Sequence, residues 1–140
     1  MSLTNIFGIT GSALSAQSAR LNATASNLAN ADSVSGDFAS AYRSRQVVLQ
    51  STDLSSDFYQ AKNKSVGVKV SGVIESGDEP IKQYRPDHPL ADADGNVYVS
   101  NINMVEEMTN MIEASRSYQT NVQVASTAKQ LIQQTLRLGQ

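Results

Sequence analysis

The sequence predicts a mainly α-helical protein with a small β insertion, in which long N- and C-terminal helices pair as a coiled-coil-like hairpin around a central β-hairpin and loop region. Three observations predict this class. Residues 96–138 contain neither Gly nor Pro, apolar residues recur every seven positions in both terminal segments, and short alternating apolar runs occur between them. We therefore expect an N-terminal helix in 1–31, a central loop and small β region in 32–100, and a C-terminal helix in 101–140, with the two helices forming one core domain.

The C-terminal segment predicts one long helix that begins near Asn101 as its cap and stops at Gly139. Two tracks of residues, one turn apart, share a face of this helix. The first track is Met104, Met111, Tyr118, Ala125 and Ile132. The second is Met108, Ser115, Val122, Lys129 and Leu136. A seven-residue repeat makes a helix supercoil around a neighbour, so this face is expected to need a partner.

The N-terminal segment carries large apolar residues at strict seven-residue spacing: Phe7, Leu14, Leu21 and Leu28. Small residues follow four positions after the first three of them: Gly11, Ser18 and Ala25. Because glycine weakens helical turns, the secure helix is expected from Ser12 to near Asn30, with residues 5–11 as weaker helical turns before it. A helix folding back on the C-terminal helix would cover one stripe of these residues. The remaining surface is poor in charge, which suits close helix contacts.

The central region predicts short strands separated by turns. Strand patterns occur over 42–50, over 66–74 with a bulge at Gly72, and over 81–84 and 97–99. Residues 31–42 indicate a loop, and residues 51–65 an irregular excursion. The residues Asp94, Gly95 and Asn96 predict a tight turn.

Composition excludes several classes of protein. The 140 residues are enough for one domain, and the formal net charge of -2 with no basic cluster argues against a nucleic-acid partner. Cysteine is absent, which removes disulfides and thiolate chemistry. No segment approaches the roughly 20 apolar residues of a membrane span, so no direct membrane insertion is expected. The first ten residues carry no basic residue before an apolar core, so no cleavable Sec signal is expected.

No catalytic, cofactor-binding or metal-binding site is predicted, and the chain is not expected to be an enzyme. His88 is the only histidine, and a catalytic or metal site would need further ligands or a nucleophile nearby. The residues from Asp92 to Gly95 are like a calcium-binding loop, but the glycine comes too early and Asn103 stands where the loop needs Glu. The cluster of Met104, Met108 and Met111 is better explained as a helix seam than as a promiscuous binding surface.

Both terminal segments resemble the signatures of one family. Residues 12–22 and 26–33 resemble the N-terminal signature of the bacterial flagellar axial proteins, which form the rod and hook. Residues 106–108 and 111–122, which include Ile112, resemble the C-terminal helix of the same family, as do residues 92–97 and 135–139. The residues Ser26 and Asn27, with Val34, Ser35 and Gly36 after them, depart from the distal rod and hook pattern and favour a proximal rod subunit.

The resemblance implies a structural subunit of the flagellar basal-body proximal rod, the tubular drive shaft that transmits torque to the hook and filament. It implies partners among copies of the chain and other rod subunits, a location in the rod across the periplasm, and export by the flagellar type III apparatus without signal cleavage. The expected subunit interface comprises Phe7, Leu14, Leu21, Asn27, Leu28, Asn30, Met104, Met108, Met111, Ile112, Tyr118, Val122, Ala125, Ile132 and Leu136. The alternative is a soluble helical adaptor or export chaperone that binds a single partner.

Overall fold

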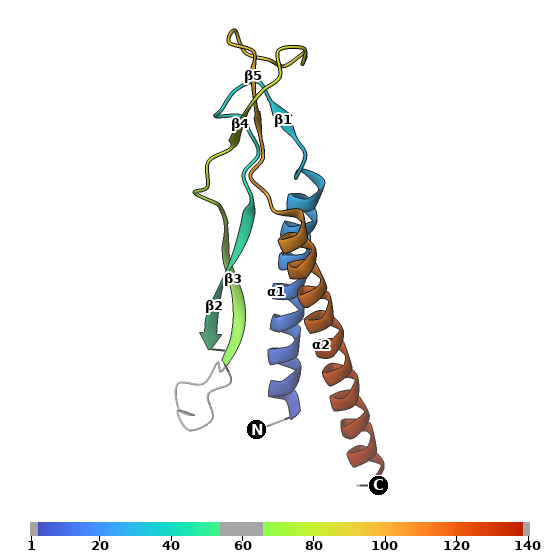
Figure 1. The fold of residues 1–140 in the computed structure, drawn as a ribbon. Coiled ribbons are helices and arrows are strands. Elements are labelled where there is room, and N and C mark those ends of the chain that lie inside the picture. Colours follow the sequence, from blue (N-terminus) through green and yellow to red (C-terminus); the bar gives the residue numbers. More distant parts are fainter. Residues whose placement is uncertain (1–2, 54–65, 139–140) are drawn as a thin grey trace.

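The computed structural model describes residues 3–53 and 66–138 and consists of two long helices and two small antiparallel sheets. Helix α1 (Leu3–Ala29) and helix α2 (Met104–Leu138) run antiparallel and in contact, so that α1 begins and α2 ends at the same end of the molecule (Figure 1). The two helices and the small β insertion confirm the predicted class in outline.

The strands form two separate sheets. Strands β1 (Val34–Ser35), β5 (Asn96–Val99) and β4 (Ile81–Tyr84) form a three-stranded sheet in that order, beyond the end of the helical pair where α1 ends and α2 begins (Figure 1). Strands β2 (Arg45–Asp53) and β3 (Val66–Glu75) form a two-stranded sheet that lies along α1 (Figure 1). We call the first the upper sheet and the second the β2–β3 sheet.

Both helices begin at a different residue from the one predicted. Helix α1 starts at Leu3, two residues before the weaker turns expected over 5–11. Nothing lies within 4 Å of a Cβ built at Gly11, so this glycine sits in the helix without a packing reason. Helix α2 starts at Met104 because Asn103 caps it: its Oδ1 accepts hydrogen bonds from the N–H groups of Val105 (3.1 Å) and Glu106 (3.4 Å). The predicted cap, Asn101, is therefore wrong by two residues.

The predicted strands are confirmed within a few residues, and one more is added. The pairing of β2 with β3 shifts between Val48 and Leu49, where Ser71 has no partner, so the bulge lies next to Gly72 as predicted. Strand β1 lies within the predicted loop, where it pairs with Val99 and Tyr98. Of the predicted excursion over 51–65, residues 51–53 belong to β2 and the remainder lies outside the described residues.

The core is built mostly from small side chains. The buried apolar residues among those described are Ala16, Ala31, Ala41, Val97, Ala114 and Ala128. Val97 is fully buried in β5, the central strand of the upper sheet. Its neighbour Tyr98 meets Phe38 edge to face, with the ring centroids 5.8 Å apart. Small residues let α1 and α2 approach closely but bury little apolar area, so each helix keeps large apolar residues at its surface.

Candidate interaction surface

The face of α2 that contacts α1 includes most of the first predicted track but not the second. Ala114 and Ala128, two heptads apart, are buried, and Met111, Ala125 and Ile132 are half-buried beside them. The sequence therefore located the first track, apart from the exposed Met104 and Tyr118. It missed the track of Ala114 and Ala128, because alanine gives little contrast in hydropathy.

The second predicted track lies on the far side of the first, away from Ala114, and faces outward. We call this track the outer row: Met108, Ser115, Val122, Lys129 and Leu136. Its apolar members are exposed, Met108 by 49%, Val122 by 44% and Leu136 by 66%. The two tracks were expected to share a face that needs a partner, and the second track is the part of that face that α1 leaves uncovered. Ile112, adjacent to this row, is 52% exposed.

A second apolar surface lies on the opposite flank of α2. Ile6 of α1 lines a hollow of about 250 Å³ together with residues of α2: Gln123, Val124, Thr127, Ala128 and Leu131. Val122 and Leu131 are nine residues apart, which is about two and a half helical turns and puts them on opposite sides of α2. Val124 and Leu131 were not among the interface residues expected from the sequence. Helix α2 thus exposes apolar side chains on both flanks of its contact with α1.

The predicted seam of α1 is only partly covered. Leu14, Leu21 and Leu28 are half-buried and Phe7 is 37% exposed, whereas the small residues Gly11, Ser18 and Ala25 of the predicted seam are exposed. The buried positions of this helix are Thr10, Ala16, Thr24 and Asn27. Three of these four are polar, which explains why apolar periodicity did not find them.

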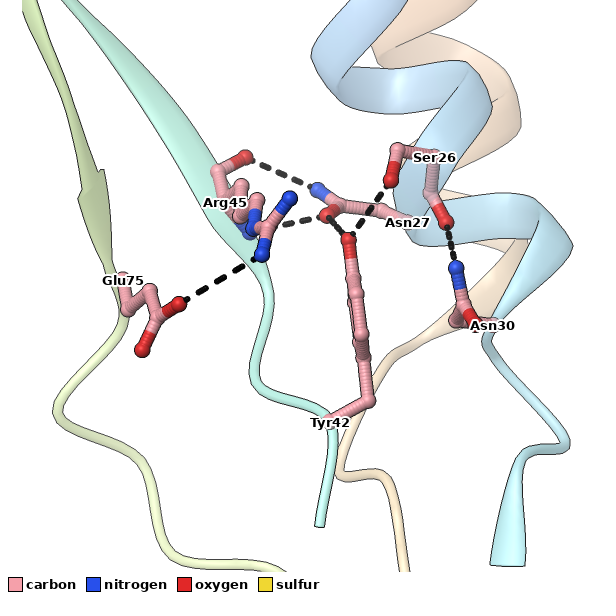
Figure 2. A network of polar contacts seen from close by, with 6 residues as sticks. All are labelled: Ser26, Asn27, Asn30, Tyr42, Arg45 and Glu75. Carbon is pink, nitrogen blue, oxygen red and sulfur yellow. Dashed lines mark hydrogen bonds and ion pairs between the residues drawn. The ribbon is translucent and has the colours of Figure 1, made fainter. Parts of the chain in front are cut away.

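Asn27 joins α1, β2 and α2 and is 1% exposed. Figure 2 shows its contacts with Arg45 and Tyr42. The amide Nδ2 donates to the carbonyl of Arg45 (2.9 Å) and to Oε2 of Glu107 (3.2 Å). The amide Oδ1 accepts from the N–H of Arg45 (2.8 Å) and from the hydroxyl of Tyr42 (3.1 Å). Both donors and both acceptor positions are used within the chain. This leaves Asn27, an expected interface residue, no hydrogen-bonding capacity for another subunit.

Asn30, also expected at the interface, has a local role. Its Nδ2 donates to the carbonyl of Ser26 (2.8 Å) at the end of α1, which also accepts from the main-chain N–H of Asn30 (3.2 Å) (Figure 2). The hydroxyl of Ser26 lies 3.0 Å from that of Tyr42, so the end of α1 and the Asn27 contacts form one connected network. Arg45 and Glu75 add an ion pair with N and O 3.7 Å apart, whose exposed side chains contribute little stability.

The candidates for chemistry have structural roles. Nδ1 of His88 accepts a hydrogen bond from the N–H of Leu90 (3.1 Å). Oδ1 of Asp92 accepts from the N–H groups of Asp94 (3.0 Å) and Asn96 (2.7 Å) in a turn where Gly95 has φ of 76°. Within residues 3–53 and 66–138 no group of three or more His, Asp or Glu residues could hold a metal ion. The same ranges contain no helix long and apolar enough to cross a membrane.

Comparison with known proteins gives matches at both ends and over the full length. Residues 9–36 match the family model described as flagella basal body rod protein, and residues 93–138 match the model for the C-terminal region of the flagellar basal body rod FlgEFG proteins. The flagellar basal-body rod protein FlgC of Salmonella typhimurium is 52% identical over 140 residues, covering 100% of both chains. The chain belongs to the FlgC family of flagellar basal-body rod proteins.

Further FlgC relatives also match along their whole length. The protein of Yersinia enterocolitica is 49% identical over 140 residues, and that of Buchnera aphidicola subsp. Acyrthosiphon pisum is 44% identical over 144 residues. Both alignments cover 100% of this chain and of the relative. The names of these FlgC proteins describe a rod component, which confirms the prediction that the chain is not an enzyme. They do not favour the alternative of a soluble adaptor or export chaperone.

Proposed function

We propose that the chain is a structural subunit of the flagellar proximal rod, where it assembles with copies of itself and with other rod subunits into a tubular shaft that transmits torque. Membership of the FlgC family supports a rod subunit. The observation that carries the assembly mode is the exposure of apolar side chains along α2 on both flanks of its contact with α1. A helix that is apolar on several sides is stable when it is surrounded by neighbours.

The proposed subunit contacts are the exposed members of the expected interface. They comprise Phe7, Met104, Met108, Ile112, Tyr118, Val122 and Leu136. The hollow beside Ile6 provides a further apolar surface on the opposite flank. The half-buried members pair α1 with α2, in a coiled-coil-like hairpin, and keep part of their surface for neighbours: Leu14, Leu21, Leu28, Met111, Ala125 and Ile132. Contacts spread along two helices would share a torsional load among many residues.

The experiment adds one negative charge to the outer row. Met108→Asp and Val122→Asp would each put a carboxylate into a contact that excludes water, which is costly for an unpaired charge. The control is Gln130→Asp, which adds the same charge at an exposed polar position outside the row. We expect both outer-row variants to disappear from purified basal bodies and to abolish swimming, and the control to assemble. Normal basal bodies and swimming in both outer-row variants would refute the proposal.

We also propose that the chain is exported by the flagellar type III apparatus without cleavage and that the rod it enters crosses the periplasm. Support comes from family membership. Mass spectrometry of the subunit taken from purified basal bodies tests this route, because an uncleaved chain keeps its N-terminal residues. A shortened N-terminus would contradict it.

A further inference from the structure

The helices that form the contact between α1 and α2 are built on a seven-residue repeat, which relates the observed axial register to a slipped one. Both helices bury small residues at multiples of the heptad spacing, Thr10 and Thr24 on α1 and Ala114 and Ala128 on α2. Sliding α2 by seven residues, about 10 Å, toward the upper sheet would put Asn121 and Thr135 at the places of Ala114 and Ala128. The slip therefore keeps the heptad spacing of the buried positions, although each buried alanine is replaced by a larger polar residue.

We propose that Asn27 is a register latch, which fixes α2 against α1 through its hydrogen bond to Glu107. Asn27 is the most buried polar residue of the part of the chain that the structure describes. A slip of α2 by one heptad toward the upper sheet would bring Ala114 to the place of Glu107. The Nδ2 hydrogen would then lose its acceptor in a buried site, which is unfavourable. A single buried polar residue in a helical seam can specify register in this way.

Arg45, at the start of β2, fixes the orientation of the Asn27 side-chain amide. Arg45 presents its N–H to Oδ1 and its carbonyl to Nδ2, so the Asn27 amide pairs with it as a neighbouring strand would, and only one amide orientation satisfies both groups (Figure 2). That orientation directs the second Nδ2 hydrogen to Glu107. The hydroxyl of Tyr42 fills the remaining acceptor position. The register of the helices is thereby tied to the docking of the β2–β3 sheet on α1.

Disulfide trapping in the full chain tests the latch, since the sequence contains no cysteine. Ile6 and Ala128 line the same hollow, so Ile6→Cys with Ala128→Cys reports the observed register. Thr135 takes the place of Ala128 when α2 slips by one heptad, so Ile6→Cys with Thr135→Cys reports the slipped register. In the parent chain we expect the first pair to cross-link in preference to the second.

Four variants distinguish an effect on the helix register from a general effect on stability. Asn27→Ala and Glu107→Ala should each lower the ratio of native to slipped cross-links about tenfold, the effect of one lost buried hydrogen bond. Glu107→Gln keeps a carbonyl acceptor and should keep the ratio. Asn30→Ala removes a bond within α1 alone and should also keep it.

The result for Glu107 decides the proposal even if Asn27→Ala does not fold. An unchanged cross-link ratio in Glu107→Ala would overturn the latch, and so would the absence of the native cross-link in the parent chain. A ratio that falls equally in Glu107→Gln would also overturn it, because the loss would then not follow from the missing acceptor. The latch acts within one chain, so the outcome does not depend on whether the chain enters a rod.

Discussion

The hydroxyl of Ser12 accepts a hydrogen bond from the main-chain N–H of Val68 (3.2 Å) while it donates to the carbonyl of Ile9 (2.8 Å). Val68 lies in β3, whereas the contact at the other end of α1 is made by Arg45 in β2. The β2–β3 sheet therefore contacts α1 through β3 at one end and through β2 at the other, and the two strands cross over each other between these contacts (Figure 1). The bulge at Ser71 lies between these contacts and increases the twist that the crossing needs.

Ser12→Ala should loosen the β3 end of this crossing. The N–H of Val68 would lose its acceptor, with a loss of about 1 kcal/mol of stability. Amide hydrogen exchange at Val68 measures the effect directly and should accelerate. Ser15→Ala is the matched control, because Ser15 is exposed on the same helix. Equal exchange at Val68 in both variants would contradict the assignment.

Gly36→Ala should destabilise the upper sheet. A Cβ at this position would lie 2.7 Å from the carbonyl oxygen of Leu90, and a main-chain atom cannot move away as a side-chain end can. We expect a loss of about 1–3 kcal/mol in the free energy of unfolding, measured by urea denaturation. Gly77→Ala is the control, since nothing lies within 4 Å of a Cβ there, and it should change stability by less than about 0.5 kcal/mol.

Asn103→Ala should weaken the start of α2. Removing the side-chain acceptor leaves the N–H groups of Val105 and Glu106 without their cap, at a cost of about 1 kcal/mol. Asn101→Ala tests the cap expected from the sequence and should leave stability nearly unchanged. Thermal unfolding followed by circular dichroism compares the two variants. A larger loss in Asn101→Ala would show that the helix begins earlier in solution.

The stability of the turn at Asp92 should depend on pH. The hydrogen bond from the main-chain N–H of Asn96, with a second from Asp94, lowers the pKa of the Asp92 carboxyl below its ordinary value of 3.8. A lowered pKa in the folded state means that the ionised carboxylate stabilises the fold above pH 3.8, and that this contribution disappears as the pH falls through the lower, folded-state value.

Asp92→Ala separates this contribution from other effects of acid. Amide exchange at Asn96 should be faster in the variant than in the parent at neutral pH, and the stability derived from it should converge with the parent's below pH 3.8. A difference between the two proteins that stays constant through this range would show that the charge of Asp92 has no part in holding the turn.

Residue patterns predicted the positions of the helices and strands better than they predicted which face of each helix is buried. Alternating valines located β3, and the heptads located both helices, because apolar period follows directly from backbone geometry. The covered face of α2 could not be predicted in the same way, since Ala114 and Ala128 have little hydropathic contrast, whereas the conspicuous Met108 and Val122 face outward. Strand β1 has two residues, too few to show any period.

The heptad pattern predicted the apolar positions of the outer row but not the hydrogen bonds of Asn27. The large apolar residues of the outer row were expected to need a partner, and they are exposed in the single chain. Asn27 was selected from a family signature as an interface residue, and its four hydrogen bonds within the chain depend on Arg45, Tyr42 and Glu107, which are distant in sequence. Such long-range polar partners leave no periodic signal.

The attachment of the β2–β3 sheet at both Ser12 and Asn27 has a mechanical consequence. These residues are fifteen positions apart on α1, or about 22 Å along the helix axis. A sheet pinned at one point could pivot, but one fastened at two well-separated points resists rotation about either of them. Bending or twisting of α1 would therefore have to deform the sheet as well, so the sheet acts as a splint that stiffens the N-terminal helix.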